Sequence, residues 1–405
     1  MNLTSSHGSE ELNAGQSLRS KVSIVRCAAY EPEAVEAALR RNLELIGGIE
    51  SIVRPGNRVL LKVNLLSPRP PEQAVTTHPI VVGAMLRLVR AAGGRPVVGD
   101  SSGGLLAGQA QTEKALSVTG IRAAAAANGA ELANFDAGRI AVVENSASSP
   151  VPVLHLAQSV LDADVVINMP KLKTHGATLF TGALKNMFGT VPGGRKAAYH
   201  RMAPTLNEFA NLLVDIYAAV KPGLTVMDGV WSMEGNGPAH GRPRRAGLLL
   251  ASTDGVALDT VAAAVIGLRP DDVATTRVAA ARGIGEGDFA AIDIVGERLS
   301  EVRIPDFRLP PTAVLAVAPR FLLRGAFGML RARPVVDPER CVRCWVCADN
   351  CPAGVIRRGG EIPVIDYHSC ISCYCCQELC PQAAVTIRYD NRLVRWLAGR
   401  LGRID

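Results

Sequence analysis

The chain has 405 residues, enough for roughly two or three domains, and it is 48% hydrophobic and 20% charged, as is typical of a soluble globular protein. The formal net charge is +7, and ten residues are Cys. Residues 1–20 are polar and lack the apolar segment of a secretory signal, so we expect a disordered N-terminus, a cytoplasmic location and Cys that bind metal rather than form disulfides. The most apolar run, residues 312–330, is interrupted by Pro319, Arg320 and Arg324 and is therefore a poor membrane span.

Short apolar runs of strand character alternate with helical stretches as far as about residue 300. The predicted strands and helices, in chain order, are a strand at 21–25, a helix from Pro32, strands at 58–63, 96–99, 164–168, 224–227 and 246–252, and helices at 79–92, 204–220 and 256–266. Nearly continuous apolar strands separated by helices are typical of a parallel sheet that is covered on both faces. The sequence therefore predicts an α/β domain, residues 21–304, with a mostly parallel sheet.

Polar residues follow most of these predicted strands. They are Lys62, Asn64, Asp100, Asn168, Asp228 and Asp254. Ligands of open α/β sheets bind beyond the carboxyl ends of the strands, so we expect these residues to converge on a site. The same residue types also serve as turn and helix-cap residues, which is an equal alternative for Asp100 and its neighbours.

Residues 171–200 contain many cations and no acid. The cations are Lys171, Lys173, His175, Lys185, Arg195, Lys196 and His200. One interpretation is a basic loop in solvent, and the other is recognition of a carboxylate or phosphate on a substrate. The runs at 62–64, 77–79, 99–101, 168–175 and 182–189 resemble the domain of unknown function 362 family over roughly residues 22–295. This resemblance implies a fold and a pairing with a C-terminal ferredoxin module, but no reaction.

The C-terminal part contains a basic linker, residues 305–333, and then two runs of the form C-x2-C-x2-C-x3-C-P within residues 334–390. This run is typical of ferredoxins with two 4Fe–4S clusters, in which the fourth Cys of each run binds the cluster of the other. We assign Cys341, Cys344, Cys347 and Cys380 to one cluster, and Cys370, Cys373, Cys376 and Cys351 to the other. A pair of zinc sites fits these two identical runs poorly. Cys375 is left over, either as a packed thiol, which we favour, or as an alternative ligand.

We favour an iron–sulfur redox protein, a ferredoxin-coupled oxidoreductase that transfers electrons to or from an anionic small molecule in the α/β domain. The candidate site residues are Lys171, Lys173, His175, Lys185, Asp100 and Asp228. One alternative is a pure electron carrier between redox partner proteins, with the α/β domain as a docking scaffold. Another is a non-redox binding module with structural clusters, in which case nucleic acid is not the expected partner because aromatic residues are scarce and no recognition helix concentrates the charge. A closed polar pocket at the strand ends would favour the enzyme over the carrier.

Residues 391–405 alternate apolar residues with four Arg and predict a basic amphipathic helix. Packing against the rest of the protein is the favoured role for this helix. Peripheral contact with a membrane surface is the less favoured alternative.

Overall fold

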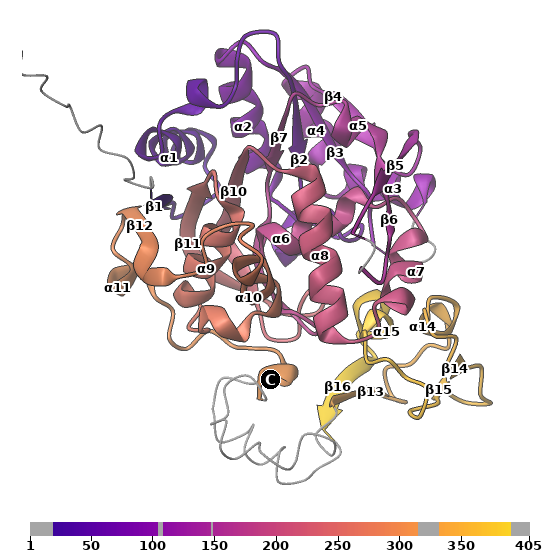
Figure 1. Cartoon of the computed structure of the whole chain (residues 1–405). Helices are drawn as coiled ribbons and strands as arrows, with labels where there is room; N and C mark the ends of the chain where they lie inside the picture. Colours follow the sequence, from indigo (N-terminus) through magenta and orange to yellow (C-terminus); the bar gives the residue numbers. More distant parts are fainter. Residues whose placement is uncertain (1–18, 104–107, 147–148, 315–331, 390–405) are drawn as a thin grey trace, which may run out of the picture.

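The computed structural model of the protein describes residues 19–103, 108–146, 149–314 and 332–389. Figure 1 shows an α/β domain and, beside one end of it, a small C-terminal ferredoxin module. Residues 1–18 of the predicted disordered N-terminus, most of the predicted basic linker and the predicted C-terminal helix lie outside the described residues, whereas Ser20 is ordered as the first residue of a strand. Within the described residues, no helix is long and apolar enough to cross a membrane.

A ten-stranded mixed sheet forms the centre of the α/β domain. Its main path runs in the order β12 (Ile292–Gly296), β1 (Ser20–Arg26), β11 (Arg242–Ser252), β10 (Leu224–Glu234), β7 (Val165–Asn168), β2 (Arg58–Lys62), β3 (Arg95–Asp100) and β4 (Glu131–Asn134). Neighbouring strands are parallel except where β11 pairs with β1 and β10. Two further strands, β8 (Lys171–His175) and β9 (Leu179–Thr181), extend from β10, where β8 is parallel to β10 and antiparallel to β9. This confirms the predicted α/β fold with a mostly parallel sheet.

Helices cover both faces of the sheet (Figure 1). On β11, Leu249 and Ala251 pack in the core that includes α1 (Pro32–Leu45) and α2 (Pro79–Ala91), whereas Leu248 and Leu250 pack in the core that includes α9 (Gly255–Val265). Alternate residues of one strand therefore enter different cores, as the pleat requires. The remaining helices and a separate hairpin of the α/β domain are α3 (Gln109–Val118), α4 (Ile121–Ala127), α5 (Gln158–Leu161), α6 (Ala183–Asn186), α7 (Arg195–Met202), α8 (Leu206–Val220), α10 (Ala274–Ala281), α11 (Leu299–Val302), β5 (Ile140–Glu144) and β6 (Val153–Ala157).

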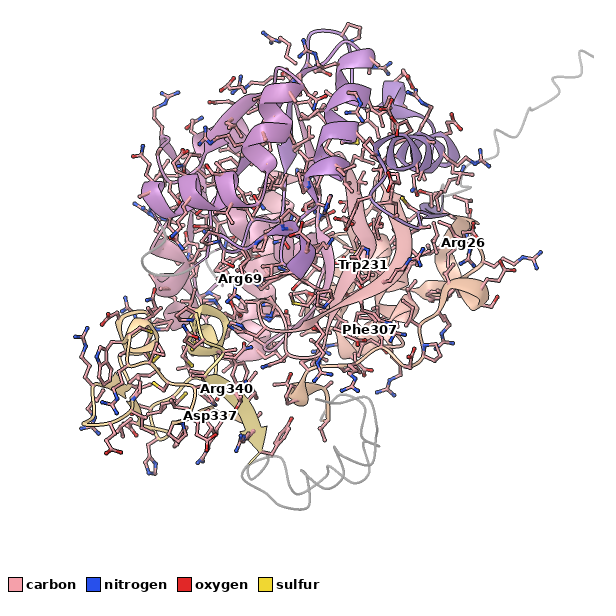
Figure 2. The ribbon with its side chains drawn as sticks, turned by 180° about the vertical axis from the view of Figure 1, so that it is seen from behind. Arg26, Arg69, Trp231, Phe307, Asp337 and Arg340 are labelled. Atoms are coloured by element: carbon pink, nitrogen blue, oxygen red, sulfur yellow. The ribbon has the colours of Figure 1, made fainter. Side chains whose placement is uncertain are left out.

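Residues 305–314, the first part of the predicted linker, pack against the α/β domain as part of it. Phe307, Leu309 and Ala313 are buried in the same core as α9. Figure 2 views the molecule from behind, with Phe307 labelled on the α/β domain and Asp337 and Arg340 labelled on the module.

The ferredoxin module repeats one local structure twice. It contains β13 (Ala332–Val336), α14 (Val346–Asp349), β14 (Ile356–Arg357), β15 (Val364–Ile365), α15 (Cys375–Leu379) and β16 (Val385–Tyr389). Trp345 and Tyr374 precede the two helices, and both have left-handed backbone conformations, with φ of 62° and 60°. Arg343 and Ser372, two residues earlier, are left-handed as well, with φ of 56° and 52°. The two Cys runs therefore share backbone geometry as well as spacing.

Two local expectations differ from the structure. The solvated loop, one of the two interpretations of the cationic segment, does not hold for Lys171 and the four residues after it, because they are buried and form β8, which pairs with both β10 and β9. Strand β10 does not end at Met227 but continues to Glu234, so Asp228 lies within the strand. In the module, β15 has only two residues, and it follows Pro363, which offers no backbone N–H to a neighbour.

Candidate functional site

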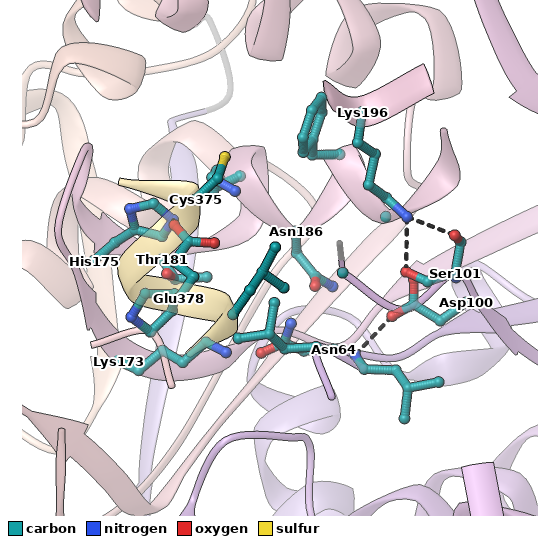
Figure 3. A pocket seen from close by; sticks show the side chains of 18 of the residues that line it. Asn64, Asp100, Ser101, Lys173, His175, Thr181, Asn186, Lys196, Cys375 and Glu378 are labelled. Carbon is teal, nitrogen blue, oxygen red and sulfur yellow. Dashed lines mark hydrogen bonds and ion pairs between the residues drawn. The ribbon is translucent and has the colours of Figure 1, made fainter. Parts of the chain in front are cut away.

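A cavity lies at the carboxyl ends of the central strands, between the α/β domain and the ferredoxin module (Figure 3). Its volume, measured as the space open to the centres of water-sized molecules, is about 90 Å³, enough for a small ligand or several waters. The polar and charged residues in its wall are Lys62, Asn64, Asp100, Ser101, Lys173, His175, Thr181, Lys185, Asn186, Lys196, His200, Asn350, Cys375 and Glu378. We call this space the interdomain cavity.

The cavity is rich in ammonium groups, two of which have their partners within the protein. Lys62 Nζ lies 3.0 Å from Asp100 Oδ1 and donates to the carbonyl oxygen of Val63 at 2.6 Å. Lys196 Nζ donates to Ser101 Oγ at 2.5 Å and to the carbonyl oxygens of Ser101 and Ser102 at 3.1 and 2.8 Å, which uses all three of its protons. These two lysines therefore hold the ends of β2 and β3 against α7.

The other two lysines have donors to spare. Lys173 Nζ is buried and donates to the carbonyl oxygen of Val75 at 2.7 Å, which leaves two of its three protons. Lys185 Nζ lies over the rings of Phe188 and Phe209, 5.1 and 5.8 Å from their centroids, and finds no hydrogen-bond acceptor among the described residues. Such cations favour the binding of an anion.

Burial perturbs the pKa values of these groups. It lowers the pKa of Lys173 to about 7, with a further contribution from the charge of Lys185, and it lowers the pKa of Lys185 itself. It also raises the pKa of Asp100 to about 6, against the attraction of Lys62. The cavity therefore holds several charges that water does not solvate, and a bound anion would stabilise the charged lysines.

His175 connects the cavity wall to the ferredoxin module. Its Nδ1 accepts hydrogen bonds from the backbone N–H groups of Ala177 and Thr178 at 3.0 and 3.3 Å, which assigns the ring proton to Nε2. Nε2 lies 3.1 Å from Oε1 of Glu378, so it donates to that carboxylate. Burial lowers the pKa of His175, which favours a neutral ring. One hydrogen bond thus joins β8 to α15.

Two smaller cavities, each of about 20 Å³, lie inside the ferredoxin module. One is lined by Cys341, Cys344, Cys347 and Cys380, and the other by Cys351, Cys370, Cys373 and Cys376. The fourth Cys of each run thus faces the first three of the other run, as in the predicted assignment. Among the described residues, no three His, Cys, Asp or Glu side chains are set to hold a single metal ion. Four Cys around one space, with the fourth taken from the other run, is the arrangement typical of a ferredoxin with two 4Fe–4S clusters.

The structure brings together four of the six candidate residues of the α/β domain and separates the other two. Asp100, Lys173, His175 and Lys185 line the interdomain cavity, whereas Lys171 and Asp228 do not. Strand β8 places Lys171 beside Asp228 of β10, and Lys171 Nζ lies 2.8 Å from Asp228 Oδ2.

The Lys171–Asp228 pair makes its further hydrogen bonds with other protein groups rather than with the cavity. Tyr30 OH donates to Asp228 Oδ1 at 2.9 Å and accepts from Lys171 Nζ at 2.6 Å. Asp228 Oδ2 also accepts from the backbone N–H of His78 at 2.9 Å. This network joins β8 and β10 to two loops, and the prediction that Lys171 and Asp228 share the site with Lys173 is wrong. Asp254, another residue that follows a strand, caps α9.

Sequence reasoning missed several cavity residues, chiefly Thr181, Asn186 and Glu378. Asn186 is on the four-residue helix α6, whose first two N–H groups donate to the buried carboxylate of Asp259 at 2.6 and 3.1 Å. Glu378 lies between Cys376 and Cys380, and no local pattern separates it from a surface acid. Cys375, which we expected to be a packed thiol, lies in the cavity wall.

Comparisons with known proteins match both the α/β domain and the ferredoxin module to known families. A family described as domain of unknown function 362 matches residues 59–264, and a 4Fe-4S dicluster domain matches residues 333–381. A thylakoid-associated protein of Synechocystis sp., sll1697, is 39% identical over 303 residues, which cover 71% of this chain and 91% of that protein.

Two solved structures have weaker similarity. The lactate racemase apoprotein from Thermoanaerobacterium thermosaccharolyticum has a TM-score of 0.39 and 9% identity, covering 60% of this chain and 55% of that one. A protein from Thermotoga maritima has a TM-score of 0.34 and 13% identity, covering 57% of each chain. Both scores are too low to support a conclusion about function. From the family matches, the chain belongs to the domain of unknown function 362 family and has a C-terminal iron–sulfur domain of the 4Fe–4S type.

Proposed function

We propose that the protein binds two 4Fe–4S clusters and uses them for single-electron transfer to or from a small anionic molecule in the interdomain cavity. The observation that carries this proposal is the position of α15. This five-residue helix contributes Cys376 to the second cysteine cavity, and it contributes Cys375 and Glu378 to the wall of the interdomain cavity. A ligand in the cavity would therefore lie beside the loop that holds the second cluster.

The lining of the two cysteine cavities supports one assignment of the cluster ligands. Cys341, Cys344, Cys347 and Cys380 would hold the first cluster, and Cys370, Cys373, Cys376 and Cys351 would hold the second. Such clusters supply or accept one electron at a time. Apolar side chains such as Val336, Ile356 and Ile365 pack among the cysteines and limit the access of water.

The interdomain cavity supplies the substrate site. Lys173 and Lys185 would bind the negative group through their spare donors, and His175 would keep the carboxylate of Glu378 in place. The α/β domain presents a polar cavity at the strand ends rather than a flat, filled edge, and this favours the oxidoreductase over a pure carrier.

The first cluster site is the better entry point for a redox partner protein. Cys344 is exposed, and the neighbouring Val342 is 59% exposed. Both residues belong to the wall of the first cysteine cavity. Electrons would pass between a partner at this surface and the ligand in the interdomain cavity, through the two sites in turn.

The proposal is tested with protein purified without oxygen, reduced with dithionite and freed of excess reductant. Small anionic metabolites are added one at a time, and the recovery of cluster absorbance is followed. At least one anion should reoxidise the protein faster than buffer alone, and Lys185→Met should slow this reaction at least about tenfold at low anion concentration. Lys114→Met, which removes an exposed lysine that does not belong to the cavity wall, should have no effect. If no anion exceeds the buffer rate while a partner protein reoxidises the clusters, the carrier interpretation replaces this one.

A further inference from the structure

The wall of the interdomain cavity also contains buried oxygen atoms that find no hydrogen-bond partner in the described part of the chain. Oδ1 of Asn186 and Oγ1 of Thr181 are buried and have no hydrogen-bond partner among the described residues. Both side chains line the cavity, and the two residues are 3% and 4% exposed. An unpaired buried polar atom is unfavourable, so each of these atoms calls for a partner that the described part of the chain does not supply. Figure 3 shows Asn186 between the group around His175 and the group around Lys196.

The orientation of the Asn186 amide is fixed by its other end. Nδ2 donates to Oδ1 of Asn168 at 2.8 Å and lies 3.3 and 3.5 Å from the carbonyl oxygens of Val63 and Lys62. Asn168 is fixed in turn, because its own Nδ2 donates to the carbonyl oxygen of Ala183 at 2.9 Å. Exchanging the oxygen and nitrogen of Asn186 would point an oxygen at three oxygens. The unpaired atom is therefore an acceptor, and it requires an O–H or N–H group.

The charges in the wall set the charge of the ligand. Lys62 is paired with Asp100. Lys196 is balanced by Asp136, which accepts a hydrogen bond from the same Ser101 hydroxyl at 2.5 Å. The spare charges are then the ammonium groups of Lys173 and Lys185 and the carboxylate of Glu378, a balance of one positive charge. This balance matches a monoanion such as a carboxylate better than a phosphate dianion.

We propose that the ligand of the interdomain cavity is a small hydroxylated carboxylate, whose carboxylate binds Lys185 and Lys173 and whose hydroxyl donates to Oδ1 of Asn186. This inference rests on the anion-binding part of the proposed function and makes it specific. Lys185 and Asn186 are consecutive residues of α6, which Asp259 holds in place. Both side chains line the same cavity of about 90 Å³, so the acidic and hydroxyl groups of the ligand would be close together, as on neighbouring carbon atoms.

The test uses matched pairs of ligands on the oxidised, cluster-loaded full-length protein, with binding measured by isothermal titration calorimetry. The pairs are glycolate with acetate and lactate with propionate, and inorganic phosphate is the third probe. The hydroxylated member of each pair should bind at least about tenfold more tightly, because a ligand without the hydroxyl group leaves Oδ1 of Asn186 without a donor. Asn186→Leu, which keeps the size of the side chain but has no acceptor, should bind both members of a pair within about twofold of each other.

The preference of the unmodified protein between paired ligands does not depend on whether the variant folds. Equal binding of both members, no binding of any carboxylate, or tighter binding of phosphate would each overturn the inference. If the hydroxylated carboxylates bind with the expected preference but never reoxidise the reduced protein, the redox proposal fails while this inference stands.

Discussion

Nε2 of His175 and Oε1 of Glu378 lie 3.1 Å apart across the boundary between the α/β domain and the ferredoxin module. A second contact lies beside it, where Nε2 of Gln377 donates to the carbonyl oxygen of Asn236 at 3.2 Å. Both module residues belong to α15, so this helix forms a wall of the interdomain cavity and also anchors the module.

Glu378→Ala should weaken this anchor. The substitution leaves the Nε2–H group of His175 buried without an acceptor, which costs about 1–3 kcal/mol. Glu378→Gln retains an amide oxygen that can accept the same hydrogen bond, so it should cost less. The free energy of unfolding from denaturant titration of the two variants provides the comparison. Equal values for Ala and Gln would show that the hydrogen bond does not stabilise the interface.

Lys185→Met should weaken anion binding without lowering the stability of the ligand-free protein. Removing an ammonium group that finds no acceptor among the described residues should reduce the affinity for a bound carboxylate by about 1.5–3 kcal/mol, the contribution of a charged hydrogen bond. Without ligand, the variant should be as stable as the unmodified protein or more so, because a buried charge has been replaced by an apolar side chain. Calorimetric titration and thermal unfolding measure the two effects. A large loss of stability in the ligand-free variant would contradict the assignment of Lys185 as a ligand-binding cation.

Anion affinity should fall as the pH rises through 7. The pKa of Lys173 is lowered to about 7, chiefly by burial, so the free protein loses this ammonium charge above that pH. A bound anion favours the charged form, so above pH 7 binding takes up a proton and weakens by at most about tenfold per pH unit. Titrations between about pH 6 and 9 in buffers of different ionisation enthalpy would report the proton uptake. Lys173→Met should flatten the profile near pH 7, and an unchanged profile would assign the dependence to another group.

Gly189→Ala should disrupt the buried pair of Lys62 and Asp100. A Cβ atom at this position would overlap Asp100 Oδ1 and lie 2.7 Å from Lys62 Nζ. Overpacking of this kind destabilises a protein by about 1–3 kcal/mol. Gly360→Ala is the matched control, because a Cβ there would meet no atom within 4 Å and the backbone is not left-handed. Unfolding transitions of the two variants should therefore separate, and coincident transitions would show that the pair adapts to the added methyl group.

Variants in the second Cys run test the assignment in which the fourth Cys of each run binds the cluster of the other run. Cys380→Ala should damage the first cluster site, since Cys380 lies with Cys341 and Cys344, whereas Cys376→Ala should damage the second. Cys375→Ala should retain the iron and acid-labile sulfide of the unmodified protein. Iron analysis and electron paramagnetic resonance of the reduced protein distinguish these cases. Zinc in place of iron, or loss of iron from the Cys375 variant, would contradict the assignment.

Much of the fold could be predicted from the sequence because its signals are local. Strand β2 is an apolar run between turn residues, α2 begins at a Pro and ends before two Gly, and each Cys run has its own fixed spacing. The rest depends on tertiary packing. Asp228 looked like a residue at a strand end, but pairing with β11 extends β10 past it. Asn186 and Glu378 became site residues only where the module docks on the α/β domain, which local pattern does not encode.

The five residues of α15 serve both the wall of the interdomain cavity and the second cluster site. Natural selection for a different substrate would act on Cys375 and Glu378, whereas selection for a different reduction potential would act on the surroundings of Cys376. A substitution in α15 that changes the substrate specificity therefore also changes the surroundings of the second cluster, and the reverse holds as well. We therefore expect relatives with new specificities to have diverged first in the parts of the wall that α6 and α7 contribute, where the metal-binding loops are not disturbed.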